Sequence, residues 1–200
     1  MFDRTQLRPA IFLDKDGTLI DNVPYNVDPA LMELAPSAEE ALTVWHEAGY
    51  ALVVVSNQSG IARGYFAESD LEAVEARLHE LLTESGVPLA GFYYCPHHPD
   101  GQVAAYAIAC ECRKPAPGLI LAAASELGVD LAQSWLVGDI LDDIEAGRRS
   151  GCRTVLIENG NETQWRKGQE REPHAIAPNL ASAARVIRSA GAHCCVARRR

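Results

Sequence analysis

The chain has 200 residues, of which 48% are hydrophobic, and its 27 acidic and 18 basic side chains give a formal net charge of -9. This length and composition suit one globular domain with its own core, while the negative charge argues against nucleic acid as a partner. The longest stretches without a charged residue, 48–62 and 85–99, are shorter than the roughly 20 residues of a membrane span. Since the N-terminus also lacks the pattern of a secretory signal, we expect a cytoplasmic monomer with no membrane partner.

Short apolar runs alternate with helical patterns along the chain. Because these runs are apolar on both faces, they are typical of strands that are fully buried in a parallel sheet. In chain order, the predicted strands are 10–13, 50–55, 91–94, 134–137, 154–157 and 175–177.

The segments between these runs are predicted to be helical. Ser37 and Glu40 match a capping box that opens a helix towards Ala48, and Gly49 is expected to end it. Strand–helix alternation predicts an α/β fold, a doubly wound Rossmann-like parallel sheet with helices on both faces. The other predicted helices are 70–86, 118–127, 142–150 and 179–190.

Residues 1–190 are assigned to a single domain. Residues 191–200, which end in three arginines, are predicted to form a flexible tail.

Two carboxylates follow the first predicted strand, in the segment 14–18 (DKDGT). The backbone turns just past a strand end, so Asp14 and Asp16 can converge, and their mutual repulsion favours a cation between them. With Mg²⁺ bound, one carboxylate can attack phosphorus while the other holds a proton for the leaving oxygen. The alternative is an Asp-Gly turn with exposed acids.

Three later segments offer the other groups that a phosphoryl-transfer site needs. Arg113 and Lys114 precede a predicted helix whose N-terminus attracts anions. Asp139 follows the fourth strand, in a segment whose carboxylates suit Mg²⁺. Each segment alone could be a polar loop, but a nucleophile, donors, a cation and a metal-binding acid together point to an aspartyl-phosphate mechanism. The donors follow the second strand: Ser56, Asn57, Gln58 and Ser59.

Together these segments resemble the four motifs of the haloacid dehalogenase (HAD) superfamily, and the two acids of DKDGT resemble its phosphatases rather than its dehalogenases. The resemblance implies a HAD-like fold in which Asp14 is the nucleophile and an Mg²⁺ ligand. It implies that Asp16 is the general acid/base and offers its backbone carbonyl to Mg²⁺. It also implies that Ser56 and Lys114 hold the phosphoryl group, and that Asp139 completes the Mg²⁺ site.

A cluster of potential metal ligands lies in the loop 95–112. Three thiolates and one imidazole can form a closed, structural Zn²⁺ site, and zinc there would fix the basic residues that follow the loop. His98 is an alternative to His97, and chance cysteines in a loop are the alternative to a metal site. The expected Zn²⁺ ligands form C-x-H and C-x-C pairs: Cys95, His97, Cys110 and Cys112.

The loop 95–112 and the segments 57–64 (NQSGIARG) and 112–115 (CRKP) are similar to the family of heptose bisphosphate and histidinol-phosphate phosphatases. The resemblance implies an Mg²⁺-dependent, zinc-stabilised phosphatase that acts on a small phosphorylated metabolite. The substrate it implies is D-glycero-D-manno-heptose 1,7-bisphosphate, cut at the 7-phosphate, with histidinol phosphate as the alternative.

The same resemblance implies that Arg113 helps to recognise the substrate and that a loop with Asn22 and Tyr25 lines the pocket. The interval between Thr18 and the first long helix is too short for a large cap domain. At position 140 this chain has Ile140 where the heptose enzymes carry lysine, so one cation of that family's site is missing.

Two other interpretations fit the residues less well. A polynucleotide 3′-phosphatase would use a basic surface with aromatic side chains, which the net charge of -9 opposes. A non-catalytic, zinc-stabilised binding module has no chemical need for both Asp14 and Asp16, or for Lys114 and Asp139.

Overall fold

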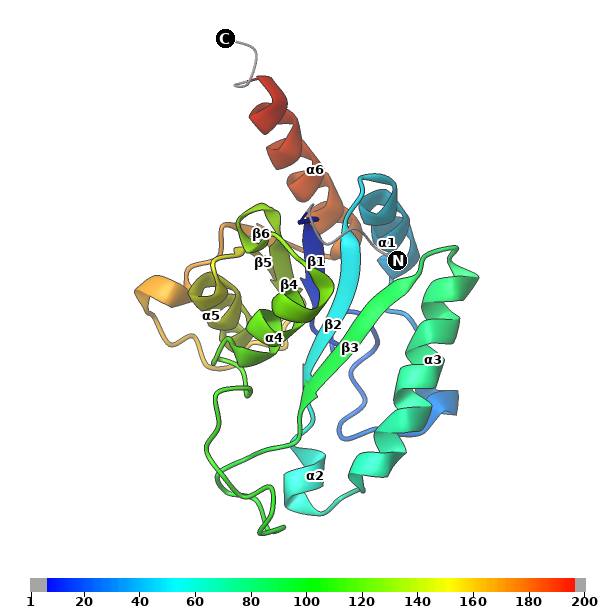
Figure 1. Ribbon diagram of the computed structural model, residues 1–200, viewed down its shortest axis with the longest axis vertical. Helices are drawn as coiled ribbons and strands as arrows, with labels where there is room; N and C mark the ends of the chain where they lie inside the picture. Colours follow the sequence, from blue (N-terminus) through cyan, green and yellow to red (C-terminus); the bar gives the residue numbers. More distant parts are fainter. Residues whose placement is uncertain (1–6, 197–200) are drawn as a thin grey trace.

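Strands in the computed structural model, which describes residues 7–196, form a parallel sheet between two layers of helices (Figure 1). The six strands lie in the order β3-β2-β1-β4-β5-β6, and each neighbouring pair is parallel. The doubly wound sheet predicted from the sequence is therefore confirmed. The strands are β1 (Ala10–Leu13), β2 (Ala51–Asn57), β3 (Leu89–Cys95), β4 (Trp135–Gly138), β5 (Arg153–Ile157) and β6 (Ala175–Ala177).

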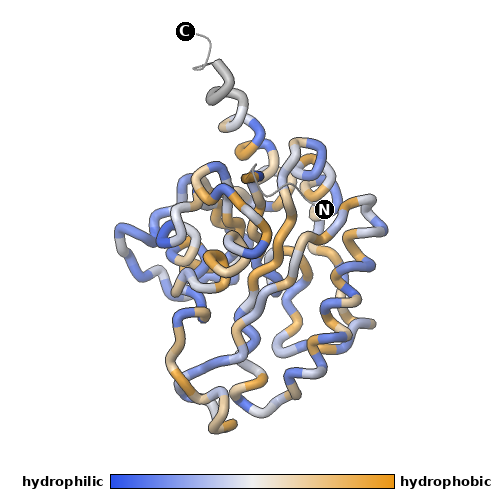
Figure 2. The backbone as a smooth tube through the Cα atoms, in the orientation of Figure 1, coloured by the Kyte–Doolittle hydropathy of each residue, from blue (hydrophilic) through white to orange (hydrophobic). Residues whose placement is uncertain are grey.

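Helices cover both faces of the sheet because alternate strand residues point to opposite faces. Ile11 and Leu13 of β1 join one core cluster, whereas Phe12 joins the other. Figure 2 shows hydrophobic residues gathered along the strands and hydrophilic ones along the outer turns of the helices. The first face carries α1 (Ala38–Glu47), α3 (Leu71–Glu84) and α6 (Leu180–Val196), and the second carries α4 (Gly118–Leu127) and α5 (Leu141–Ser150).

Several short helices lie in the connections. A four-residue helix follows β2, and it was not predicted from the sequence. The short helices are α2 (Gly60–Arg63), η1 (Pro29–Leu31), η2 (Glu68–Asp70), η3 (Leu131–Gln133) and η4 (Gln169–Arg171).

The start of α1 differs from the predicted capping box, which was wrong. Ser37 has a left-handed backbone with a φ of 67°, and its side chain makes no capping hydrogen bond to α1. Its hydroxyl instead accepts a hydrogen bond from the backbone N–H of Ala181 in α6, at 3.3 Å. A tertiary contact has thus replaced the local cap, whereas the stop at Gly49, which has a φ of 85°, is as predicted.

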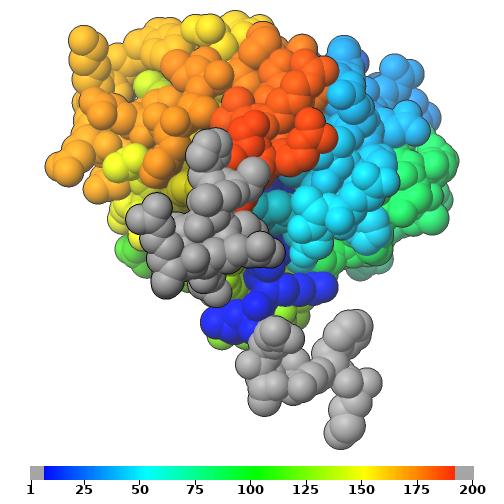
Figure 3. All heavy atoms as spheres, turned by 90° about the horizontal axis from the view of Figure 1, so that it is seen from above, coloured from blue at the N-terminus to red at the C-terminus, as the bar shows by residue number. Residues whose placement is uncertain are grey.

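Helix α6 continues to Val196 and so includes residues 191–196 of the predicted tail. Figure 3 views the molecule from above and shows α6 beside α1, with which it packs. Residues 197–200 of the predicted tail lie outside the described part of the chain. Among the residues described, none of the helices combines the length and the apolar character needed to cross a membrane.

The carboxyl ends of the central strands bring the predicted motifs to one edge of the sheet. Leu13 of β1 is in register with Val54 of β2 on one side and with Val137 of β4 on the other. The order of the strands reverses between β1 and β4, and ligands bind at such switch points in open α/β sheets. The residues that follow these three strands therefore start side by side.

Phe12 tests the packing of the central strand. Its side chain is fully buried, so we expect Phe12→Ala to lower the free energy of unfolding by about 3–5 kcal/mol, because the truncation removes buried surface and leaves a cavity. Denaturant unfolding followed by circular dichroism measures this loss. Leu121→Ala, at a position that is 45% exposed on α4, is the control and should change stability by less than about 0.5 kcal/mol. Similar losses in both variants would contradict the assignment of Phe12 to the core.

Candidate active site and metal centres

Asp14 is the first residue past β1, and its backbone N–H donates to the carbonyl of Val137 in β4 at 3.0 Å. Its buried carboxylate forms an ion pair through Oδ1 with the ammonium group of Lys114. The same Nζ lies 2.7 Å from Oδ1 of Asp143 and donates to the carbonyl of Val55 at 2.9 Å. Lys114 thus joins two acids to the end of β2.

Three carboxylates lie close together here, and two of them, Asp14 and Asp143, pair with this lysine. Oxygen atoms of Asp14, Asp139 and Asp143 all lie within 4.8 Å of one another. Burial raises the pKa of Asp139 to about 6, and the charge of Asp14 adds to the shift. Burial also raises the pKa of Asp14 to about 7, although Lys114 opposes the change. A divalent cation between these buried acids would favour their ionised forms. Because the acids offer only oxygen atoms, the cluster fits Mg²⁺.

Asp143 belongs to the stretch after β4 whose carboxylates suit Mg²⁺, but the sequence alone gives it no role of its own. The structure places it on the first turn of α5 with its side chain fully buried. Asp142, its neighbour, points elsewhere and pairs with Arg171 at 2.8 Å. The spacing between Asp139 and Asp143 gives no local signal, because Asp139 precedes α5 and the extended Ile140 separates it from the helix.

Both oxygens of the Asp139 carboxylate accept hydrogen bonds. The hydroxyl of Thr18 donates to Oδ1 at 3.1 Å, and the side-chain amide of Asn161 donates to Oδ2 at 2.6 Å. Gly17 passes close to this pair with a φ of 87°, and a Cβ atom there would stand 2.5 Å from Oδ2 of Asp139. These contacts fix the orientation of the carboxylate, and Asn161 was not found from the sequence.

Asp16 points into a pocket, and its carboxylate lies outside the three-acid cluster. Its Oδ1 is 2.7 Å from Nζ of the buried Lys15, and its Oδ2 accepts a hydrogen bond from the amide of Gln58 at 3.1 Å. The amide of Gln58 also donates to the hydroxyl of Ser56 at 2.8 Å. With its side chain 31% exposed, Asp16 can reach a molecule in the pocket.

The pocket beside Asp16 has a volume of about 160 Å³. It lies between the loop after β1 and the segment that joins β2 to α2. The ring of Tyr25 meets the ring of Tyr65 edge-on, with 4.7 Å between the centroids. The lining brings together several residues that the sequence singled out: Asp16, Asn22, Tyr25, Asn57, Gln58 and Ser59.

Two further predicted residues lie around Lys114. Asn57 forms a reciprocal pair with it, since its amide donates to the Lys114 carbonyl and its Oδ1 accepts from the Lys114 N–H, both at 3.0 Å. Arg113 extends towards the zinc loop, where its guanidinium donates to the carbonyl of His97 at 3.4 Å. Arg113 does not line the pocket beside Asp16.

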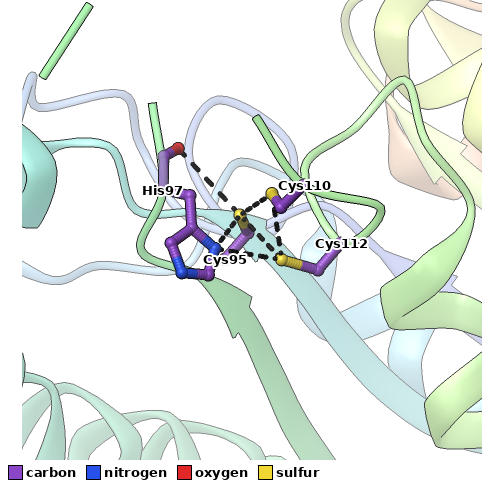
Figure 4. A group of neighbouring side chains, drawn as sticks. All are labelled: Cys95, His97, Cys110 and Cys112. Carbon is purple, nitrogen blue, oxygen red and sulfur yellow. Dashed lines mark hydrogen bonds between the residues drawn. The ribbon is translucent and has the colours of Figure 1, made fainter. Parts of the chain in front are cut away.

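Four potential ligands from the loop 95–112 converge in Figure 4. The sulfur of Cys112 lies 3.1 Å from that of Cys95, 3.2 Å from that of Cys110 and 3.3 Å from Nδ1 of His97. The three thiols are free. Three sulfur atoms and one nitrogen around a common centre fit a closed tetrahedral Zn²⁺ site.

His98 is turned away from this cluster. Its Nδ1 accepts a hydrogen bond from the backbone N–H of Asp100 at 3.1 Å, and its Nε2 lies 3.2 Å from Nη2 of Arg63. The structure therefore groups His97, and not His98, with the three thiols.

Comparisons of sequence agree with this arrangement. A family model described as HAD-hydrolase-like matches residues 111–183. A D-glycero-beta-D-manno-heptose-1,7-bisphosphate 7-phosphatase of Yersinia pestis is 43% identical over 157 residues, which cover 78% of this chain and 84% of the relative. The enzyme of that name from Escherichia coli K12 is 42% identical over 153 residues, covering 76% and 80%.

Solved structures share the fold. A putative HAD-like phosphatase of Mesorhizobium loti has a TM-score of 0.79 and 37% identity, covering 92% of this chain and 87% of that one. The D,D-heptose 1,7-bisphosphate phosphatase of B. bronchiseptica, in complex with magnesium and phosphate, has a TM-score of 0.77 and 31% identity, covering 91% and 99%. Fold and site together define a HAD-like hydrolase of the phosphatase class. Within that class, the chain belongs to the family of the D-glycero-β-D-manno-heptose-1,7-bisphosphate 7-phosphatases.

The two adjacent histidines provide a test of the zinc cluster. We expect His97→Ala to lose most of the bound zinc, because the closed site then lacks its one nitrogen ligand. His98→Ala should keep zinc at the wild-type ratio, since His98 contacts Asp100 and Arg63 instead. Elemental analysis of the purified variants measures the zinc content. Equal zinc contents in the two variants would contradict the proposed ligand set.

Proposed function

We propose that the protein removes the 7-phosphate of D-glycero-β-D-manno-heptose 1,7-bisphosphate through a phosphorylated Asp14. The observation that carries this proposal is the carboxylate of Asp14, buried at the end of the central strand between Lys114 and two further acids. The relatives that are 42–43% identical bear the name of this reaction, which supports the substrate.

In the first step, Oδ1 of Asp14 stays paired with Lys114, and the second oxygen attacks phosphorus. A bond forms between Asp14 and phosphorus while the bond from phosphorus to the sugar oxygen breaks. Asp16 gives its proton to that oxygen, and the ammonium group of Lys114 attracts the negative oxygens of the phosphoryl group. Attachment to a nucleophile thus splits one difficult displacement into two easier ones.

In the second step, Asp16 acts as a base. It takes a proton from a water molecule that attacks phosphorus, so the bond to Asp14 breaks and inorganic phosphate leaves. Gln58 and Lys15 both contact the Asp16 carboxylate and hold it at the pocket wall for this exchange. Ser56, which contacts Gln58, is proposed to donate a hydrogen bond from its hydroxyl to the phosphoryl group.

The metal ions have separate tasks in this proposal. The residues that would hold Mg²⁺ are Asp14, Asp139 and, through its backbone carbonyl, Asp16, with Asp143 paired to Lys114 behind them. Bound Mg²⁺ would supply positive charge against the phosphoryl oxygens. Zn²⁺ would hold the loop 95–112 and, through it, the backbone of Arg113 and Lys114.

The sugar is proposed to lie in the pocket beside Asp16. The amide of Asn22 there suits sugar hydroxyl groups, which both donate and accept hydrogen bonds. Arg113 is proposed to recognise the substrate from the zinc-loop side. All these groups come from one chain, so we propose a single catalytic domain that acts as a monomer. We also propose that it acts in the cytoplasm, because the relatives are enzymes of sugar-phosphate chemistry.

Substitution of the two acids of DKDGT tests the mechanism. We expect Asp14→Asn to abolish phosphate release, because an amide cannot attack phosphorus, and Asp16→Asn to lower kcat by about 10²–10⁴-fold, the usual contribution of a general acid/base. Asp21→Asn, at an exposed position in the same segment, is the matched control and should keep wild-type activity. Undiminished turnover by Asp14→Asn would refute the mechanism.

A substrate panel tests the proposed specificity. Phosphate release is measured with both anomers of heptose 1,7-bisphosphate, fructose 1,6-bisphosphate, histidinol phosphate and a 3′-phosphorylated oligonucleotide. We expect kcat/KM for the β-anomer to exceed the others by roughly 100-fold, a ratio that reflects real discrimination in the pocket. A higher value for histidinol phosphate would transfer the assignment to that substrate and leave the mechanism unchanged.

A further inference from the structure

The segment after β5 reaches the active site through three side chains that the mechanism does not use. Asn159 donates its amide to the carbonyl of Gly17 at 2.7 Å. Asn161 donates to Oδ2 of Asp139 at 2.6 Å. Glu162 accepts a hydrogen bond from the backbone N–H of Leu141 at 2.6 Å, at the start of α5. The segment therefore contacts both acid-bearing stretches, the one after β1 and the one after β4. In Figure 1 the chain after β5 runs beside α5.

This segment is held in shape by its own hydrogen bonds. The backbone N–H of Asn161 donates to Oδ1 of Asn159 at 3.2 Å, and the backbone N–H of Gln164 donates to Oε1 of Glu162 at 2.5 Å. The side chains of Asn159 and Glu162 thus each make one hydrogen bond within the segment and one to a residue outside it. The backbone of Asn161 is fixed by Asn159. The amide of Asn161 is presented to Asp139 from a defined direction.

Gly17 shows how closely the three stretches meet. A Cβ atom at this position would stand 2.5 Å from Nδ2 of Asn161 and 2.5 Å from Oδ2 of Asp139. The hydrogen bond between these two residues therefore passes directly against the backbone of Gly17, in a space that only glycine leaves open. A side chain there would push the two groups apart.

The chemistry of the donor also fits a metal-binding carboxylate. Thr18 and Asn161 engage one oxygen each of Asp139, so the carboxylate cannot turn, yet each oxygen keeps a second lone pair for a cation. Both donors are neutral. A lysine or arginine in place of Asn161 would orient the carboxylate equally well, but its positive charge would repel a divalent cation.

We propose that Asn161 is a positioning residue for the Mg²⁺ site: it holds the Asp139 carboxylate in the orientation that the ion requires. Asn159 and Glu162 keep the segment 159–162 docked on the stretches after β1 and β4. The proposal rests on the proposed function, because it takes Asp139 as an Mg²⁺ ligand.

The test is Mg²⁺ binding to the full chain, measured by isothermal titration calorimetry on wild type, Asn161→Ala and Gln164→Ala. Gln164→Ala is the matched control, since it alters an exposed side chain of the same segment. We expect Asn161→Ala to raise the Kd for Mg²⁺ by about 10-fold or more, as the loss of a group that orients a metal ligand usually does. The control should bind as the wild type does.

Kinetics and melting temperature separate positioning from a general loss of structure. Asn161→Ala should recover most of its kcat when Mg²⁺ is in excess, with little change in the KM for the sugar phosphate and in the melting temperature without Mg²⁺. Asn159→Ala, which removes the hydrogen bond to the carbonyl of Gly17, should also raise the Kd for Mg²⁺. This variant replaces Asn161→Ala in the test if Asn161→Ala does not fold. Wild-type Mg²⁺ affinity in a folded Asn161→Ala would overturn this inference alone. A wild-type protein that does not bind Mg²⁺ would overturn the proposed function with it.

Discussion

The buried charge of Lys114 is the constraint on which the site depends. Burial of an ammonium group is unfavourable unless acids pair with it. Asp14 and Asp143 meet this need, and although burial opposes it, their charges raise the pKa of Lys114. These acids come from the end of β1 and the start of α5, and the lysine comes from the stretch that follows the zinc loop. Because loss of Lys114 would leave both buried acids without their cation, the two ion pairs fix how these segments meet.

The loop 95–112 needs support of its own, because long connections without regular structure are uncommon in compact domains. The four potential Zn²⁺ ligands close its base, as Figure 4 shows. Its outer part is held separately: the hydroxyl of Tyr106 donates to Glu68 at 2.6 Å, and the N–H of Gln102 donates to the carbonyl of Ala62 at 2.7 Å. The loop is thus attached both to the sheet and to α2, which follows the pocket-lining segment. Zinc at the base would pass this rigidity to Lys114.

The sequence predicts the strands and the ends of most helices well, because continuous apolar runs and glycine stops are local signals. It fails where a distant contact decides the outcome: the hydroxyl of Ser37 bonds to α6 instead of capping α1. Adjacent histidines such as His97 and His98 cannot be separated from the pattern alone, since the path of the loop decides which one faces the thiols. Asn161 has no local signal, because its role depends on how the segment after β5 returns to the site.

Charge balance explains why the site uses amides as well as cations to orient its acids. When all three carboxylates are ionised, the one ammonium group leaves two negative charges in the buried cluster, which is the charge that Mg²⁺ would offset. A further lysine or arginine inside the cluster would reduce its attraction for the ion. Neutral donors avoid this effect, and both donors on Asp139, the hydroxyl of Thr18 and the amide of Asn161, are neutral. Lys114, a buried cation that pairs with two acids of the cluster, also reaches the carbonyl of Val55 near the end of β2, beside the position proposed for the phosphoryl group. Positive charge therefore lies beside the position proposed for the phosphoryl group, and the Asp139 carboxylate is oriented by neutral donors alone.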